Sequence, residues 1–76
     1  MNKWEFTGRV NYLKKVNGFI SMRIFNAFEI TCLCPCVIKT LFIHKGYDVH
    51  VEGHFEMFIK PKKHKVMLIV DKINKV

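Results

Sequence analysis

The chain has 76 residues, half of them hydrophobic, so its composition is that of a folded domain and excludes a disordered segment. Thirteen Lys and Arg against six Asp and Glu give a net charge of +7, which favours a polyanionic partner, nucleic acid first. The length predicts a single domain over residues 1–76, with self-association as a further source of stability. No stretch reaches the apolar length that spans a membrane, and the first ten residues lack the apolar run of a signal peptide. We therefore expect a cytoplasmic protein.

The first expected element is a long strand from Trp4 to Tyr12, in which apolar residues and a glycine alternate with polar residues. The alternation places Tyr12 on the same face as Trp4, and Gly8 inside the strand marks a bulge or a bend. The Asn17-Gly18 pair follows between two β-prone runs. It predicts a tight hairpin turn, because both residues tolerate positive φ.

Two further strands are expected after this turn. The strand from Phe19 to Phe25 has aliphatic residues and methionine on one face, and aromatic residues beside the guanidinium of Arg23 on the other. The next strand runs from Phe28 to Cys34 and ends at Pro35, since proline cannot donate a hydrogen bond to the ladder. Both faces of this third strand carry apolar residues, so the alternation leaves open which face is buried.

The second half of the chain predicts a helix and two strands. Apolar residues at helical spacing between Cys36 and His44, followed by Gly46, predict one short helix. A long strand is expected over Lys45–Lys60, with Gly53 at its middle, where a bend lets a small sheet close into a barrel. The last strand is expected over Val66–Val70, or as far as Ile73. The alternation of the long strand predicts these residues on its core face: Val49, Val51, Phe55 and Met57.

The order of these elements predicts an all-β fold, a five-stranded Greek-key OB-fold barrel with one short helix between strands 3 and 4. Barrels of this type bind oligonucleotides or oligosaccharides on the face of strands 2 and 3 and in the loops joining strands 1 to 2 and 4 to 5. The chain concentrates lysines around these two loops, and they are Lys14, Lys15, Lys60, Lys62, Lys63 and Lys65. The charge therefore lies where this fold would use it.

The chain also resembles the bacterial single-stranded DNA-binding proteins over most of its length. The opening Asn2-Lys3 and then Gly8-Arg9-Val10 are similar to the start of that family, and Lys45-Gly46 with Val49-His50-Val51-Glu52-Gly53 is similar to its fourth strand. The resemblance implies that Phe28 is a base-stacking aromatic residue, whereas Cys34 and Lys60 stand where the family often has two more. The chain stops at Val76 without the acidic tail of the family, which implies a minimal or accessory member.

Sequence-tolerant binding of single strands combines cations along the phosphates with aromatic faces on which bases stack. The competing interpretation is that phenylalanine in so small a domain belongs to the core and that the lysines form a solvated surface. Trp4 is expected in the core or at an interface. The candidate nucleic-acid-binding residues are Lys14, Lys15, Phe19, Arg23, Phe25, Phe28, Phe58, Lys60, Lys62, Lys63 and Lys65.

The cysteine cluster Cys32-Leu33-Cys34-Pro35-Cys36 raises the alternative of a zinc site, with His44 as a fourth ligand. Its spacing argues against zinc, because Cys-x-Cys on a strand points two thiols along one face about 6.5 Å apart. We expect reduced, apolar thiols and no bound metal or cofactor. No acid, base and nucleophile set can be assembled, so no enzyme and no small-molecule substrate are expected.

The sequence therefore predicts a non-enzymatic protein that binds single-stranded DNA in replication, recombination or repair. RNA remains an alternative nucleic acid, and a protein–protein interaction module is an alternative function class. The edge of the first strand predicts a homodimer or a higher homo-oligomer, as in the resembled family. Edge charges at Lys3, Glu5 and Arg9 would instead protect a monomer.

Overall fold

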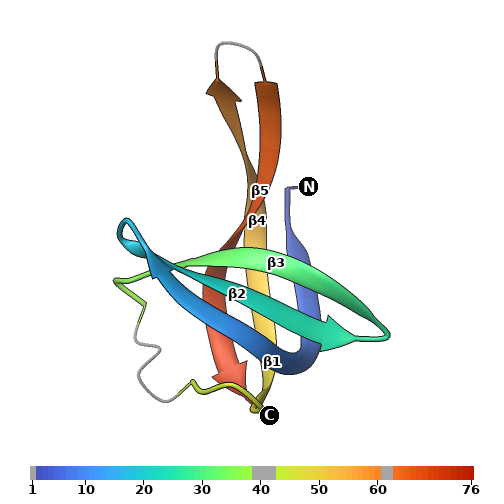
Figure 1. The fold of residues 1–76 in the computed structure, drawn as a ribbon. Helices are drawn as coiled ribbons and strands as arrows, with labels where there is room; N and C mark the ends of the chain where they lie inside the picture. The colour runs from blue at the N-terminus through green and yellow to red at the C-terminus, as the bar shows by residue number, and fades with distance from the viewer. Residues whose placement is uncertain (1, 39–42, 61–62) are drawn as a thin grey trace.

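The structure is a computed structural model that describes residues 2–38, 43–60 and 63–76, with the backbone alone for residues 58–60, 63 and 64. Its strands form a closed barrel in the order β1-β2-β3-β5-β4 (Figure 1). All neighbours pair antiparallel except β3 and β5, which pair parallel at Leu33 and Ile69. This arrangement confirms the predicted all-β, five-stranded barrel. The strands are β1 (Trp4–Val16), β2 (Phe19–Asn26), β3 (Phe28–Pro35), β4 (Asp48–Lys60) and β5 (Lys63–Lys75).

The predicted helix over Cys36–His44 is wrong for the described residues of that segment, and residues 39–42 lie outside the described part. A turn follows β3, closed by the hydrogen bond from Ile38 N to Pro35 O at 3.0 Å, and Val37 is 90% exposed. The described apolar residues of this segment therefore do not share one buried face, since Val37 is exposed and Ile43 is buried. Several of them are β-branched, which weakens helix formation. Nowhere in the described ranges is there a helix long and apolar enough to cross a membrane.

The turns confirm the hairpin signals and shorten the fourth strand. Asn17 and Gly18 both have positive φ, 41° and 82°, as a two-residue hairpin turn requires. Only Ala27 separates β2 from β3. Gly46 has a φ of 97° in a turn, so β4 begins at Asp48 instead of Lys45.

A β-bulge in β1 overturns the predicted position of Tyr12. The register advances from Val10 opposite Ile24 to Tyr12 opposite Arg23, so Asn11 is an extra residue without a partner in β2. Because side chains alternate with period two, one extra residue exchanges the faces of everything beyond it. Tyr12 consequently lies on the outer surface, and the next residue, Leu13, packs against the core.

The core fills the barrel and settles the face of β3. Cys32 and Cys34 point inward, while the intervening Leu33 lies opposite Ser21 on the outer side. Burial raises the pKa of the Cys32 thiol to about 12 and that of Cys34 to about 11, with the neighbouring thiols adding a smaller effect. Both therefore behave as small apolar side chains. The buried hydrophobic residues are Val10, Met22, Ile24, Cys32, Cys34, Ile43, Val49, Val51, Ile69, Val70 and Ile73.

Gly53 confirms the predicted bend of β4, because no side chain fits at this position. A Cβ there would collide with the Ile69 carbonyl oxygen of β5 and lie 2.6 Å from Cζ2 of Trp4. Opposite this point β5 carries an extra residue, Asp71, between the partners of Glu52 and Gly53. The missing side chain thus lets three strands approach closely where β4 changes direction.

The residues that precede and begin β1 are fixed to β4 at the same place. The indole Nε1 of Trp4 donates to the His54 carbonyl oxygen at 3.0 Å. The side-chain amide of Asn2 donates to the Phe55 carbonyl at 2.8 Å and accepts from the Phe55 N–H at 2.9 Å. Asn2 therefore continues the β1–β4 ladder by one step with its side chain.

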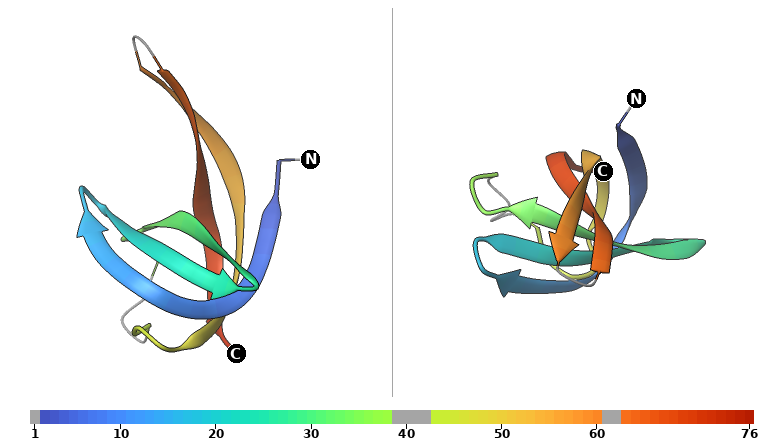
Figure 2. Two further views of the ribbon diagram at one scale, coloured as in Figure 1. Left: turned by 45° about the vertical axis from the view of Figure 1, so that its right-hand side comes forward. Right: turned by 90° about the horizontal axis from the view of Figure 1, so that it is seen from above.

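Beyond the pair of His54 with Ile69, β4 and β5 leave the barrel as a two-stranded projection, here called the arm, residues 55–60 and 63–68 (Figures 1 and 2). Phe55 and Met57 keep the core parity of β4, but Met57 is 60% exposed. Their predicted burial is therefore wrong, because the barrel ends before this part of β4 and does not cover it. Val66, opposite Met57, is also exposed, so this side of the arm is apolar and open.

At the base of the arm, His54 lies between two carboxylates. Its Nδ1 is 2.8 Å from Oδ1 of Asp71, and its Nε2 is 2.6 Å from Oε2 of Glu56. When the ring is protonated, both N–H groups donate to these oxygens. The hydrogen bonds to Asp71 and then to Glu56 raise the pKa of His54 above the usual 6.5, against a smaller opposing effect of burial.

This raised pKa predicts that the folded protein loses stability as the pH rises above 6.5. The contribution of protonated His54 is fully present below the unfolded-state pKa of 6.5 and is lost as the pH passes the raised folded-state value. Urea unfolding of the wild type and of His54→Gln between pH 6 and 9 measures it. The advantage of the wild type should shrink with rising pH.

Asp71→Asn is the matched control, since it removes the larger cause of the shift and leaves the ring in place. The NMR titration of His54 should then move towards 6.5, and the pH dependence of stability should weaken. A constant stability difference between wild type and His54→Gln across this range would contradict the prediction.

Candidate nucleic-acid interface

The candidate interface is the outer surface of the sheet formed by the second half of β1 with β2 and β3, here called the outer β1–β2–β3 face. In Figure 1 these strands cross in front of β4 and β5. Antiparallel partners point to the same side, so the register identifies the residues that share this face. On β2 they are Phe19, Ser21, Arg23 and Phe25, opposite Val16, Lys14, Tyr12 and Arg9 of β1, in that order.

Arg23 lies at the centre of this face and stacks on Tyr12. Its Cζ is 4.8 Å from the centroid of the Tyr12 ring, within the range of a cation–π interaction. Tyr12 is 38% exposed, and Arg23 is exposed. The alternation of the sequence placed Tyr12 on the face of Trp4 and so did not identify it as a residue of this surface. The local signal of the bulge is Asn11, a residue poorly suited to a strand interior.

The other arginine of the face is already paired. Arg9 Nε donates to Oδ1 of Asp48 at 3.3 Å, with both side chains largely exposed. Phe25, opposite Arg9, is 48% exposed. It borders an open hollow of about 480 Å³ that Arg9, Asn26 and Asp48 also line. The face therefore presents an aromatic ring beside an open hollow at its end.

The structure separates Phe28 from Phe25. Phe28 is 61% exposed, but its position in β3 has the parity of the core residues Ile30 and Cys32. Its ring packs on Phe6, with centroids 5.3 Å apart and planes tilted by 59°. The two predicted stacking residues thus lie on opposite sides of the β2–β3 hairpin.

The structure describes the side chains of three predicted lysines: Lys14, Lys15 and Lys65. Lys14 lies on the outer β1–β2–β3 face opposite Ser21, whereas Lys15 lies opposite Ile20 and points to the other side of the hairpin. Lys65 is exposed on the arm. The side chains of the remaining predicted residues lie outside the described part, and they are Phe58, Lys60, Lys62 and Lys63.

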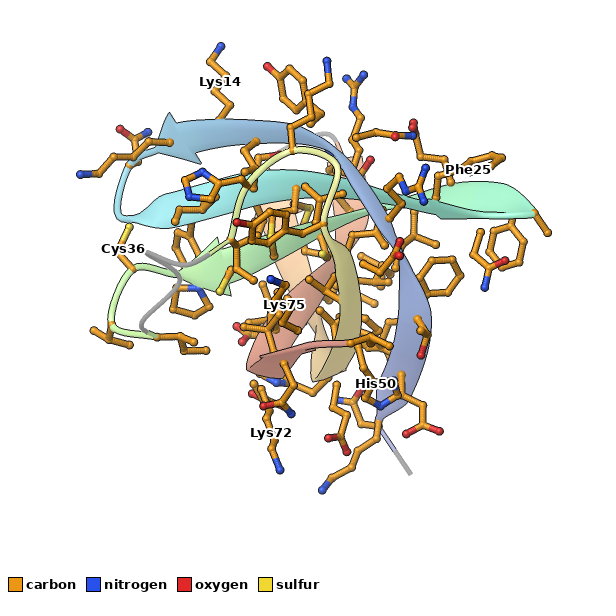
Figure 3. All side chains as sticks on the ribbon, turned by 90° about the horizontal axis from the view of Figure 1, so that it is seen from below. Lys14, Phe25, Cys36, His50, Lys72 and Lys75 are labelled. Atoms are coloured by element: carbon orange, nitrogen blue, oxygen red, sulfur yellow. The ribbon has the colours of Figure 1, made fainter. Side chains whose placement is uncertain are left out.

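Acidic side chains gather on the opposite side of the barrel. Four of the six acidic residues of the chain lie on the outer surface of β4, β5 and the first half of β1, here called the acidic face: Glu5, Glu52, Glu56 and Asp71. Figure 3 shows Lys14 and Phe25 on one side of the molecule and His50 and Lys72 on the other. On the acidic face, the carboxylates are accompanied by histidines, since His50 lies 3.7 Å from Glu5 and His54 contacts Glu56 and Asp71.

The described residues are not arranged as the zinc site that the cysteine cluster raised as an alternative. Cys32 and Cys34 are buried in the core, while Cys36 is exposed in the turn after β3. The part of the chain that is described holds no group of three or more His, Cys, Asp or Glu arranged to bind a metal ion. Phe19 is half-buried beside this turn, opposite Pro35.

No family model matches the sequence, and no curated protein matches it. Solved structures match its fold at low identity. The mitochondrial single-stranded DNA-binding protein Rim1 of S. cerevisiae has a TM-score of 0.77 and 14% identity, over 99% of this chain and 94% of Rim1. A chain of a replication protein A heterotrimer bound to ssDNA has a TM-score of 0.76 and 12% identity, and this chain spans 58% of its length. An OBody, NL8, bound to hen egg-white lysozyme has a TM-score of 0.71 and 13% identity, over 100% of this chain and 94% of that one. The chain therefore has the OB-fold that the sequence predicted.

Proposed function

We propose that this protein binds single-stranded DNA without enzymatic activity, on the outer β1–β2–β3 face between the β1–β2 turn and the arm. The observation that carries the proposal is the placement of cations beside an exposed aromatic ring. Arg23 and Lys14 share one face with Phe25, which is 48% exposed, while four of the six carboxylates lie on the other side. Cations among aromatic rings are what a single strand needs, because phosphates attract the first and bases stack on the second.

Two further features support this choice of ligand. The arm ends in lysines, with Lys60 opposite Lys63 in the register and Lys65 exposed beside them, so a strand crossing the face would meet charge at its far end. Replication protein A, in a heterotrimer bound to ssDNA, and Rim1, a mitochondrial single-stranded DNA-binding protein, share the fold of this chain. A role in replication, recombination or repair, and membership in the bacterial single-stranded DNA-binding family, belong to the same proposal.

A protein-interaction module is the second candidate. It is favoured by the exposed apolar side of the arm, where Phe55, Met57 and Val66 meet, and by the OBody that shares the fold and is bound to lysozyme. Salt separates the two functions, since phosphate binding weakens steeply with salt and an apolar interface does not. Titrations with oligo-dT and with oligo-U separate DNA from RNA.

The proposal predicts that replacing Lys62, Lys63 and Lys65 together with Ala weakens binding to a labelled oligo-dT severalfold or more. The plot of log affinity against log salt should also flatten by about two, since each phosphate contact on a single strand contributes roughly 0.7. Fluorescence anisotropy at several salt concentrations measures both quantities.

The matched control replaces Lys3, Lys45 and Lys72, which removes the same three charges from the total of +7. Lys3 and Lys72 border a hollow on the acidic face that Glu5 and Glu52 also line, so this triple variant should retain most of the affinity. Equal losses for the two triple variants would mean that only net charge matters and would refute a localised interface.

Phe25→Ala should weaken oligo-dT binding by about 1–3 kcal/mol, the contribution of one stacked base. Its stability should fall by less than the 3–5 kcal/mol typical of a core phenylalanine, because Phe25 is half exposed. Phe28→Ala tests the second stacking residue in the same assay. Since Phe28 rests on Phe6, chemical unfolding must be measured alongside affinity. Wild-type affinity for both variants would exclude stacking on these rings.

A homodimer, or a higher homo-oligomer, is also part of the proposal. The first half of β1 pairs with β4 and the second half with β2, so residues 11–16 have one edge that no described strand covers. A second copy can pair there antiparallel. Because Lys14 and Lys15 lie on this segment, added salt should strengthen the association. Sedimentation equilibrium tests it, and a mass that stays near the 9.0 kDa of one chain at high concentration and high salt refutes the dimer.

A further inference from the structure

Arg23 is held differently from the other described cations of the outer β1–β2–β3 face, because its guanidinium contacts the ring of Tyr12. The bulge at Asn11 brings Tyr12 directly opposite Arg23, and the guanidinium carbon lies 4.8 Å from the ring centroid. Contact with a ring restricts where a guanidinium can lie, and the planar fork of arginine offers paired donors that a lysine ammonium lacks. The cation at the centre of this face is therefore oriented before any ligand arrives.

The described residues also leave the donors of Arg23 unoccupied. Among the described residues, no carboxylate or carbonyl accepts a hydrogen bond from its guanidinium, whereas Arg9 on the same face donates to Asp48 at 3.3 Å. Across the sheet, Arg23 lies opposite Thr31 of β3. The nearest carboxylate in the register, Glu29, lies opposite Phe25 and accepts from Asn11 at 3.4 Å. Arg23 thus has a guanidinium held against a ring, a full charge and N–H groups that no described residue engages.

We infer that Arg23 is the arginine that grips a phosphodiester of the bound strand, and that Tyr12 is the residue that positions it. A guanidinium offers two parallel N–H groups that match two phosphate oxygens. Holding the fork in place beforehand lowers the entropy lost on binding. Tyr12 acts through Arg23 in this assignment and contacts no base. The inference rests on the proposed function, since it names the contact that the same face makes.

Labelled oligo-dT binding at several salt concentrations tests the pair. Arg23→Gln should lower the affinity about tenfold, as expected for one charge-assisted contact, and reduce the salt slope by about 0.7. Arg23→Lys should keep the slope but not the full affinity, because the charge remains and the planar fork is lost. Tyr12→Leu should lower the affinity about two- to fivefold, in line with an exposed cation–π interaction, while Tyr12→Phe keeps the ring and restores wild-type binding.

Arg9→Gln is the matched control for charge. It removes an equal charge from the same face, but Arg9 is already paired with Asp48, so the loss should be clearly smaller than for Arg23→Gln. The double variant Tyr12→Leu/Arg23→Gln should bind like Arg23→Gln alone, because a positioning residue has no effect once its partner is gone.

An oligonucleotide with abasic sites separates phosphate gripping from base stacking. The penalty of Tyr12→Leu should persist on this ligand, since the phosphates remain. If that penalty disappears, or if Tyr12→Leu weakens binding equally in the Arg23→Gln background, Tyr12 stacks on a base and the assignment is wrong. Wild-type affinity of Tyr12→Leu also overturns it, and the proposed function then stands on the lysine triple variant. If the wild-type protein does not bind oligo-dT at all, the proposed function and this inference fall together.

Discussion

Three strands meet at Gly53 with no room for a side chain, and the remaining architecture depends on that contact. The backbone of β4 passes so close to the Ile69 carbonyl of β5 and to the Trp4 indole that any Cβ would collide with both. Residues 48–53 of β4 lie in the barrel, and after the pair of His54 with Ile69 the two strands β4 and β5 continue as the arm (Figure 2). The same approach lets Trp4 hydrogen-bond the backbone of His54 and so ties β1 to the base of the arm. One missing methyl group therefore sets where the barrel ends and where a projecting surface begins.

The distribution of charge follows from this division of the sheet. The strands that build the arm also carry most of the carboxylates, and their outer surface pairs these with His50 and His54. The outer β1–β2–β3 face carries Arg9, Lys14 and Arg23 together with the other two carboxylates, Asp48 and Glu29. Asp48 pairs with Arg9 and Glu29 accepts from Asn11, which leaves Lys14 and Arg23 to steer an anionic polymer to this face of a chain with a net charge of +7. Screening by salt limits this steering to about one Debye length, roughly 8–10 Å at physiological ionic strength.

Two irregularities, one in β1 and one in β5, place the residues with the most specific geometry. The extra residue Asn11 brings Tyr12 under Arg23, and the extra residue Asp71 carries the carboxylate that binds His54. In both cases a bulge turns a side chain towards a partner that regular pairing would have denied it. The regularly paired parts of the strands contribute the core residues. The two bulges place an arginine over a tyrosine ring and a histidine between two carboxylates.

Sequence alone determined the five strands, their order and the tight Asn17-Gly18 turn, because alternation and turn chemistry are local properties of the chain. It also placed Arg23 and Phe25 together on an exposed face of β2. It failed on the helix, since apolar spacing between Cys36 and His44 cannot reveal whether a face is available to bury. The positions of Tyr12, Phe28 and Met57 depended on the tertiary structure alone. A one-residue bulge reverses alternation without changing composition, and a strand that outgrows its barrel exposes residues whose pattern is that of a core. Which face of β3 is buried likewise depended on how the strands close, because both of its faces are apolar enough to serve.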